Sequence, residues 1–518
     1  MNRAIVRRIT AGLARYLQTA VPDAARRPVV IGFDARRGSP PFAAEAAAVL
    51  AGAGLRVLSF GGPVPTPVLA FAVRHLHAAA GLMITASHNP REDNGLKVYW
   101  ADGAQIIPPV DAGIAAAAEQ AGPLSEVPLG GPGERLGPEI IDAYLGAVVP
   151  AALPASTSAE GRRALRVAYT PLHGVGLSTA LAAFRRAGFA APAVVAAQAE
   201  PDGAFPTLPR PNPEEPGVLD LLIAEGERSR ADLLLANDPD ADRLAAVIPG
   251  PVGGWRVLTG DEIGALLADH LLRHQRQPGR RLLVSTVVSA GLVGRMADEA
   301  GAGYAETLTG FKWIMRAADA EVGRSFLFGY EEALGYAVTD RVRDKDGMSA
   351  AVALADAAAE SRSEGGSLAT RLDDLARRFG LFMTGQFSVS LAGDQDADPD
   401  ASQDAEAGAA LLEAARVKPP VSLLGQPVTV VDDLGLGLRS REDGTKDPLA
   451  LPRSDVIIWR CADGTKVAVR PSGTEPKVKV YLQVVLPANG RSDLAPLRAQ
   501  AARRLTELRA EVMEVLNL

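Results

Sequence analysis

The sequence has almost no cysteine, no long apolar run and no excess of basic residues. Its one cysteine, Cys461, excludes an intramolecular disulfide and suits a reducing compartment. No stretch reaches the roughly 18 consecutive apolar residues of a membrane-spanning helix, and no secretory apolar segment follows the start. The 518 residues carry a formal net charge of −7, which argues against a general nucleic-acid-binding surface. We therefore expect a cytoplasmic protein.

Short β-like runs alternate with alanine-rich helical stretches. Such runs lie at 29–33, 166–169, 233–236 and 282–286. This alternation is typical of α/β layers. The length, with 47% hydrophobic and 22% charged residues, predicts three or four ordinary globular domains.

An apolar run at 81–84 ends in a polar loop that presents Ser87 and His88. A strand that ends in hydroxyl and imidazole groups, and is closed by Pro90, holds reactive side chains at a fixed position. Ser87 is the candidate nucleophile, and an ordinary Ser/Asn/Pro turn is the alternative. Because neighbours on an extended segment point to opposite sides, we expect that His88 cannot simply be the base of a Ser–His dyad.

A second apolar run ends in three carboxylates spaced two residues apart, Asp238, Asp240 and Asp242. On an extended segment they project to one side, as a hard divalent cation with oxygen ligands requires, and Mg²⁺ fits best. Without a cation the carboxylates would repel one another and raise their own pKa values. Arg243 adds a group suited to a phosphate or carboxylate. The alternative is a solvated acidic turn.

Another acidic alternation, at 394–400, also follows a strand-like run. We interpret it as a surface loop, because no arginine follows it and the acidic, alanine-rich composition continues beyond it. Spacing alone does not distinguish the two acidic runs.

Four motifs together resemble those of the α-D-phosphohexomutases, the phosphoglucomutase and phosphomannomutase group. Residues 85–90 with 94–97 look like the phosphoserine loop of that family, and 238–243 look like its metal loop. Residues 329–336 stand where the family has its sugar-recognition loop, and 470–477 look like its phosphate-binding loop. The motifs follow the family's order over nearly the whole chain, which makes the set far more specific than any one motif.

The resemblance implies an α/β fold with three similar mixed α/β domains and a smaller C-terminal α+β domain around a central cleft. The expected domains are a phosphoserine domain over 1–150, a metal-binding domain over 151–255, a sugar-recognition domain over 256–378 and a phosphate-binding domain over 379–518.

The start of the chain departs from the family's pattern. Relatives carry an earlier strand and a loop whose arginine faces the transferring phosphate, and nothing before Val29 matches that loop. We therefore expect that the first domain lacks the family's N-terminal segment. The opening residues instead predict a helix whose inner face is Ile5, Ile9, Leu13 and Leu17.

The resemblance also implies the reaction of a phosphosugar mutase. Ser87 would be carried as phosphoserine, give its phosphoryl group to a sugar monophosphate and take back the other phosphoryl group of the bisphosphate. The three aspartates would hold Mg²⁺ with a phosphoserine oxygen as a further ligand. His88, Lys97 and Arg243 would surround the transfer site, with the general acid and base left open. A surface lysine after a turn is the alternative for Lys97.

The far phosphate of the substrate needs its own anion site. The candidate residues are Arg470, Ser472, Gly473 and Thr474, which offer guanidinium, hydroxyl and backbone N–H donors in a tight loop. A hairpin turn is the simpler interpretation and is compatible with this one. Lys312 matches a lysine-bearing loop of the family's third domain.

The sugar loop leaves the substrate open. Glu331 and Glu332 can accept hydrogen bonds from neighbouring sugar hydroxyls. Many relatives have serine and some have histidine where this chain has Ala333 and Gly335, so the loop looks like the branch that acts on glucose phosphates or on ribose and deoxyribose phosphates. We expect a glucose or mannose phosphate mutase, primed by glucose 1,6-bisphosphate, with a phosphopentomutase as the alternative.

Two other classes of protein, a nicotinamide-dependent dehydrogenase and a non-catalytic sugar-phosphate binder, fit the sequence less well. The segment 173–176 is similar to a dinucleotide-binding loop, but Thr179 stands in the place of its third glycine. A non-catalytic sugar-phosphate binder would have no use for Ser87 and the aspartates together. We expect small-molecule sugar phosphates as partners, with no nucleic acid or membrane, and a monomer or weak oligomer.

Overall fold

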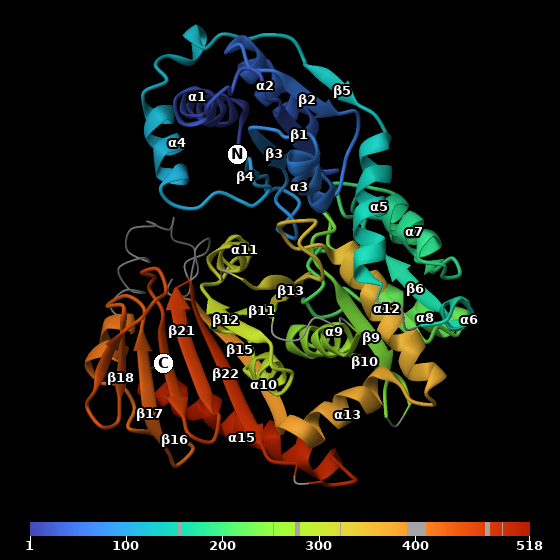
Figure 1. Ribbon diagram of the computed structural model, residues 1–518, viewed down its shortest axis with the longest axis vertical. Helices are drawn as coiled ribbons and strands as arrows, with labels where there is room; N and C mark the ends of the chain where they lie inside the picture. The colour runs from blue at the N-terminus through green and yellow to red at the C-terminus, as the bar shows by residue number, and fades with distance from the viewer. Residues whose placement is uncertain are drawn as a thin grey trace. The chain divides into compact units, whose positions relative to one another are not determined.

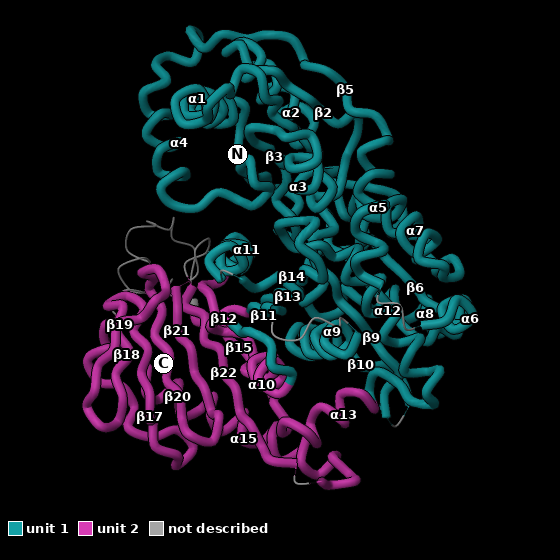
Figure 2. The backbone as a smooth tube through the Cα atoms, viewed as in Figure 1, with its two compact units in different colours: residues 1–284, 300–304, 310–369 teal, residues 285–299, 305–309, 370–518 magenta. Residues whose placement is uncertain are grey.

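The computed structural model describes residues 1–153, 157–251, 253–274, 280–321, 323–390, 411–471, 477–488 and 490–517. The chain forms two compact units (Figure 2). Unit 1 comprises 1–284, 300–304 and 310–369, and unit 2 comprises 285–299, 305–309 and 370–518. Among the described residues no helix is both long enough and apolar enough to cross a membrane. The acidic alternation at 394–400 lies outside them.

The first sheet of unit 1 has the strand order β4-β3-β1-β2-β5. Its strands are β1 (Val29–Phe33), β2 (Val57–Phe60), β3 (Ala80–Ile84), β4 (Leu96–Trp100) and β5 (Glu134–Leu136). All neighbours are parallel except β4, which runs antiparallel to β3. The accompanying helices are α1 (Arg3–Ala20), α2 (Ser39–Gly52), α3 (Thr66–His75), α4 (Val110–Glu119) and α5 (Glu139–Ala152). Every residue of β3 is buried, as expected for a strand covered on both faces.

Helix α1 buries a somewhat different face from the one expected. Leu13 and Leu17 are buried, but Ile5 is exposed and Val6 is buried instead. The helix packs against α2 and α4, and Figure 1 shows α1 beside α4. A Cβ atom at Gly12 would lie 2.6 Å from the Cβ of Ala118, so glycine permits this close approach. Helix–helix packing, which the isoleucine spacing does not reveal, selects the buried face.

The second and third sheets have the orders β10-β9-β8-β6-β7 and β12-β11-β13-β14. The second contains β6 (Val167–Thr170), β7 (Ala193–Val194), β8 (Leu233–Ala236), β9 (Ala245–Pro249) and β10 (Trp255–Val257). The third contains β11 (Arg281–Thr286), β12 (Gly303–Thr307), β13 (Ser325–Glu331) and β14 (Gly335–Ala337). Helices in this part of the chain are α6 (Ala159–Ala164), α7 (Leu177–Arg186), α8 (Asp220–Ser229), α9 (Gly260–His274), α10 (Leu292–Glu299), α11 (Phe311–Ala320) and α12 (Gly347–Ser363).

Three of the motif loops occupy equivalent places in these three sheets. In each sheet a strand leads into the motif loop, and the next strand returns antiparallel beside it, as β4 does after β3, β9 after β8 and β14 after β13. The closing pairs are Ile84 with Leu96, Ala236 with Ala245, and Glu331 with Gly335. This repeated topology confirms three similar α/β layers. It also places each motif at the carboxyl end of a strand, where functional loops are commonly held.

Unit 2 contains a largely antiparallel sheet of order β15-β22-β21-β20-β17-β18-β19, with β16 beside β17. The strands are β15 (Leu381–Ser390), β16 (Ser422–Leu423), β17 (Gln426–Asp433), β18 (Leu438–Arg441), β19 (Lys446–Pro448), β20 (Ile457–Cys461), β21 (Lys466–Pro471) and β22 (Lys477–Leu486). Helix α15 (Ala495–Val515) packs against β15 and β22, and α13 (Leu368–Phe379) precedes β15. Trp459, Val467 and Val480 are among the buried residues of its core. The β-rich C-terminal part agrees with the expected fold class.

Candidate active site

Ser87 follows β3 with a left-handed backbone, at a φ of 50°. Its Oγ lies 3.3 Å from Nδ1 of His88. The expectation that these two side chains point to opposite sides is therefore wrong, because it assumed an extended segment, and a positive φ turns the chain at Ser87. Ser87 Oγ also donates a hydrogen bond of 2.7 Å to Oδ2 of Asp238. The serine loop and the aspartate loop thus meet at the serine hydroxyl.

A buried arginine, Arg36, holds the serine loop in shape. Its side chain is 1% exposed and lies 3.3 Å from the carboxylate of Asp34. Its guanidinium donates to four backbone carbonyls of the loop, those of Ser87 and Asn89 at 2.6 Å, Pro90 at 2.5 Å and Asp93 at 3.1 Å. Arg36 is not among the site residues predicted from the sequence. The available signal was Asp34, which directly follows β1, the parallel neighbour of β3.

Asp34 links the arginine to the serine. Its carboxylate accepts hydrogen bonds from Ser39 Oγ at 2.6 Å and from Thr85 Oγ1 at 2.7 Å. Thr85 Oγ1 in turn accepts a hydrogen bond of 2.9 Å from the backbone N–H of Ser87. Because each of these buried polar groups has a partner, the network fixes the backbone on both sides of Ser87.

The three aspartates gather at a turn. Strand β8 ends at Ala236, the N–H of Ala241 donates to the carbonyl of Asp238 at 2.9 Å, and Ala241 has a φ of 58°. One carboxylate oxygen from each of Asp238, Asp240 and Asp242 lies within 4.8 Å of the others, and all three residues are buried. The predicted cluster is therefore present, but the extended conformation assumed for it is wrong.

Lysines neutralise part of this buried negative charge. Lys97 Nζ, on β4, lies 2.8 Å from Asp240 and 2.6 Å from Asp242, and Lys345 Nζ lies 3.1 Å from Asp242. Burial, followed by the neighbouring carboxylates, raises the pKa of Asp238 well above its ordinary value. At Asp240 and Asp242 burial is outweighed by the lysines, which lower the pKa values of both carboxyl groups, so these two carboxylates are stabilised in their charged form.

Two carboxylate oxygens of the cluster have no hydrogen-bond partner among the described residues. Oδ1 of Asp240 and Oδ1 of Asp242 are buried and accept no hydrogen bond from the described residues. Buried polar atoms of this kind are rare unless an ion or water satisfies them. Three carboxylates, two of which have an unsatisfied oxygen, provide the hard ligands that Mg²⁺ prefers, so the residues fit a divalent cation.

His88 and Arg243 lie beside the same cluster. The Arg243 N–H donates to Oδ1 of Asp238 at 3.0 Å, and its guanidinium lies 3.3 Å from Glu214. Burial, assisted by the positive charges of Arg243 and Lys97, lowers the pKa of His88 to about 2. The imidazole is therefore neutral near pH 7.

The sugar loop adjoins the aspartate loop. Arg243 forms a β-bridge with Gly335, and the N–H of Leu244 donates to the carbonyl of Leu334 at 3.0 Å. Glu331, at the end of β13, accepts a hydrogen bond of 3.2 Å from the Gly310 N–H. Serine, aspartate and glutamate motifs that lie far apart in the sequence thus belong to one connected cluster within unit 1.

Gly335 makes room for Lys345. A Cβ atom at this position would lie 2.4 Å from Cδ of Lys345 and 2.9 Å from Cγ of Glu331. Lys345 therefore fills the space that a side chain at Gly335 would need, and it reaches Asp242.

Lys312, Glu332 and Arg470 are the remaining candidate residues in the described part of the chain. Lys312 Nζ lies 5.9 Å from the ring centroid of Trp313, and Glu332 is half-buried. In unit 2, Arg470 of β21 stacks on Tyr481 and lies 3.3 Å from its hydroxyl oxygen. Ser472, Gly473 and Thr474 lie outside the described residues.

Three family models match the chain in order. They are the phosphoglucomutase/phosphomannomutase α/β/α domains I, II and III, which match residues 1–124, 142–251 and 259–379. The chain belongs to this family of phosphosugar mutases.

Relatives of this mutase carry different substrate names. The chain is 37% identical to a probable phosphomannomutase of Haemophilus influenzae over 93% of this chain and 92% of that protein. The chain is 34% identical to the human phosphopentomutase, over 99% of this chain and 86% of that protein. It is 33% identical to a Staphylococcus haemolyticus phosphoglucomutase, over 93% of this chain and 87% of that protein. The crystal structure of a putative phosphomannomutase from Thermus thermophilus, 25% identical, superposes with a TM-score of 0.70 over 98% of this chain and 95% of that one. These relatives establish a mutase enzyme and leave its sugar open.

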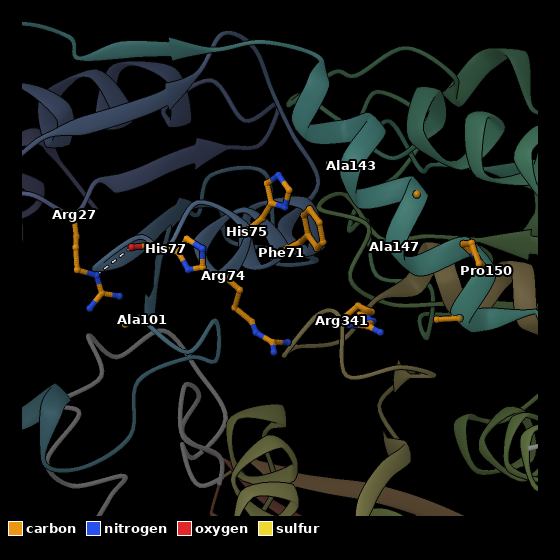
Figure 3. Close-up of a pocket in the computed structure, with 12 residues that line it drawn as sticks. Arg27, Phe71, Arg74, His75, His77, Ala101, Ala143, Ala147, Pro150 and Arg341 are labelled. Carbon is orange, nitrogen blue, oxygen red and sulfur yellow. Dashed lines mark hydrogen bonds between the residues drawn. The ribbon is translucent and has the colours of Figure 1, made fainter. Parts of the chain in front are cut away.

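A separate cavity of about 990 Å³ lies beside α3 and α5 in this mutase (Figure 3). Its lining includes Arg27, Arg74, His75 and Arg341, and among the described residues it contains none of the candidate site residues. Arg27 donates to the carbonyls of His77 at 3.1 Å and Ala78 at 2.7 Å. Arg74 and His75 occupy the last turn of α3, where positive charge stabilises a helix end. Most of this basic lining thus has a structural explanation.

Proposed function

We propose that this mutase interconverts glucose 1-phosphate and glucose 6-phosphate, with mannose phosphates as weaker or comparable substrates. The observation that carries the proposal is the hydrogen bond of 2.7 Å from Ser87 Oγ to Asp238, next to two buried carboxylate oxygens with no partner among the described residues. A serine hydroxyl beside a cation site is the arrangement that a phosphoserine carrier requires.

In the proposed reaction Ser87 starts as phosphoserine. The phosphorus–oxygen bond to Ser87 breaks while a hydroxyl oxygen of the sugar monophosphate bonds to phosphorus, and the proton lost by that hydroxyl is matched by the one that Ser87 Oγ gains as it becomes a hydroxyl again. The sugar bisphosphate then turns around, and its other phosphoryl group returns to Ser87. Glucose 1,6-bisphosphate would prime the enzyme by phosphorylating unmodified Ser87 in this second step.

The charged side chains around Ser87 would have different roles in the reaction. Asp238, Asp240 and Asp242, with a phosphoserine oxygen, would hold Mg²⁺, which when bound offsets the negative charge of the transferring group. Lys97 and Lys345 hold the carboxylates in position through contacts of 2.6–3.1 Å. Arg243 and neutral His88 line the same space, so both can contact the phosphoryl group.

Substrate recognition would fall to the other two loops. Glu331 and Glu332 would accept hydrogen bonds from sugar hydroxyls, and Lys312 on α11 would be a further sugar-binding residue. Arg470, with Ser472, Gly473 and Thr474, would bind the far phosphate. We also propose that the enzyme is cytoplasmic, because its single cysteine suits a reducing compartment. We further propose that it is a monomer or weak oligomer.

A phosphopentomutase is the second candidate function. It is favoured by the 34% identity to the human phosphopentomutase over 99% of this chain. The sugar loop does not separate the two, because Ala333 and Gly335 offer no side-chain polar group.

Intact-mass measurement and side-by-side assays test the proposal. We expect one covalent phosphate on the purified protein after incubation with glucose 1,6-bisphosphate, present in Ser59→Ala and absent from Ser87→Ala. Coupled assays with glucose, mannose and ribose 1-phosphates then rank the sugars by kcat/KM. Phosphate retained in Ser87→Ala would refute the carrier, whereas a strong preference for ribose 1-phosphate would select the second candidate.

A further inference from the structure

Two histidines and two carboxylates gather between α9 and α12, outside the catalytic loops. Helix α9 contributes His270 and His274, and α12 contributes Asp356 and Glu360. The members of each pair are four residues apart and so share a helix face. The two helices pack against each other within unit 1, which brings the pairs together.

Three of these residues place possible ligand atoms around one point. His270 Nδ1 lies 3.3 Å from Oε2 of Glu360, and His274 Nε2 lies 2.6 Å from Oε1 of the same carboxylate. The candidate ligand atoms of the three residues all lie within 4.8 Å of one another. His270 is fully buried and the His274 side chain is 18% exposed, so the cluster lies just beneath the surface.

The other nitrogen of His270 is held by an acid. His270 Nε2 lies 3.2 Å from Oδ2 of Asp356, and Arg162 donates to the other oxygen of Asp356 at 2.7 Å. A histidine that ligates a metal through one nitrogen commonly donates its other N–H to a carboxylate, which fixes the ring and its tautomer. Glu360 has comparable support from Arg273, which donates to its Oε2 at 2.8 Å.

The remaining histidine turns a buried nitrogen toward the same carboxylate. Nε2 of His274 is buried and lies 2.6 Å from Oε1 of Glu360. A cation shared between this nitrogen and the carboxylate would satisfy both atoms.

We propose that His270, His274 and Glu360 form a binding site for a transition-metal ion, with Zn²⁺ as the preferred occupant. Two imidazoles and one carboxylate suit Zn²⁺ better than Mg²⁺, which prefers oxygen ligands. Three protein ligands leave a position for water. Asp356 is a positioning residue for His270, and the bound ion would join α9 to α12. This site is independent of the mutase reaction proposed above.

Zinc binding by the full-length, chelator-treated protein tests this proposal. Excess Mg²⁺ is added to occupy the aspartate cluster, and calorimetry then counts the Zn²⁺ bound per chain. We expect one Zn²⁺ with Mg²⁺ present, and unchanged binding in Asp240→Asn and in His75→Ala, which removes an exposed histidine of α3. In Asp356→Asn the affinity should fall by about 10- to 100-fold, and in His274→Ala by about 100-fold or more.

Thermal unfolding supplies a readout that does not depend on calorimetry. Zn²⁺ should raise the Tm of the wild-type protein, because it binds the folded state, and should leave the Tm of His274→Ala unchanged. Replacing a partly exposed side chain should let this variant fold, as its Tm in the absence of metal will show. Equal Zn²⁺ affinity in wild type and His274→Ala, or no binding by wild type with Mg²⁺ present, would overturn the proposal. Spectra of the Co²⁺-substituted protein distinguish nitrogen ligands from an all-oxygen site.

Discussion

The guanidinium of Arg36 donates a hydrogen bond of 2.6 Å to the backbone carbonyl of Ser87. These residues lie 51 positions apart in the sequence, at the ends of adjacent parallel strands. The contact fixes the main chain of the candidate nucleophile and leaves its hydroxyl free to meet Asp238. A buried arginine that supports a loop in this way makes the loop's shape dependent on a distant side chain.

Arg36→Gln should therefore damage both stability and activity. Removing one partner of a buried charged network costs about 3–5 kcal/mol, and the loop carbonyls lose their donors. We expect the urea midpoint to fall and mutase turnover to drop by about 100-fold or more, as a misplaced nucleophile would cause. Arg37→Gln is the matched control, since Arg37 is the next residue and is exposed. Similar effects of the two substitutions would show that Arg36 has no special role.

Asp240→Asn should weaken metal dependence and rate together. The substitution removes one ligand charge from the cluster, so we expect a higher Mg²⁺ concentration at half-maximal activity and a lower kcat at saturation. Asp396→Asn and Asp398→Asn, in the acidic run at 394–400, should be nearly silent. A titration of activity against Mg²⁺ for all three variants makes the comparison. Inactive variants at 396 and 398 with an active Asp240→Asn would mean that the wrong acidic run was selected.

The strands and motif loops could be predicted because their signals are local. The runs 29–33 and 233–236 coincide with β1 and β8, since strands buried on both faces read as continuous apolar segments. The aspartates were recognised as a cluster because acidic side chains after such a run need an explanation. The chemistry of a motif depends on residues that are neighbours in the sequence, so it can be predicted without the fold.

The parts that could not be predicted depend on tertiary contacts or on backbone conformation. Arg36 and Lys345 act on residues far along the chain. Asp34 marks the strand end beside Arg36, but it does not identify the loop that Arg36 contacts. The positive φ of Ser87 has no residue signature either, because glycine is the usual occupant of that region. That single torsion decided whether His88 and Ser87 meet, and the sequence interpretation of it was wrong.

Glu331→Gln tests whether the third loop contacts the sugar. A hydrogen bond to a charged acceptor is worth about 1.5–3 kcal/mol, so kcat/KM should fall by about 10-fold or more. Glu119→Gln, at an exposed position on α4, should leave kcat/KM unchanged. Steady-state kinetics with glucose 1-phosphate measure both. An unchanged kcat/KM in Glu331→Gln would remove this residue from the sugar site.

Gly335→Ala tests the link between the sugar loop and the metal loop. The added Cβ would lie 2.4 Å from Cδ of Lys345, so the lysine must move, and its contact of 3.1 Å with Asp242 is the contact at risk. Losing a charge-assisted contact of about 1.5 kcal/mol should lower kcat by about 10-fold, with the larger loss at low Mg²⁺ concentration. Gly62→Ala is the control, because a Cβ at that position would meet no atom within 4 Å. If Lys345 carries the effect, Lys345→Met should show the same loss, and adding Gly335→Ala to it should change kcat little further. Fully additive effects of the two substitutions would show that the glycine acts by another route.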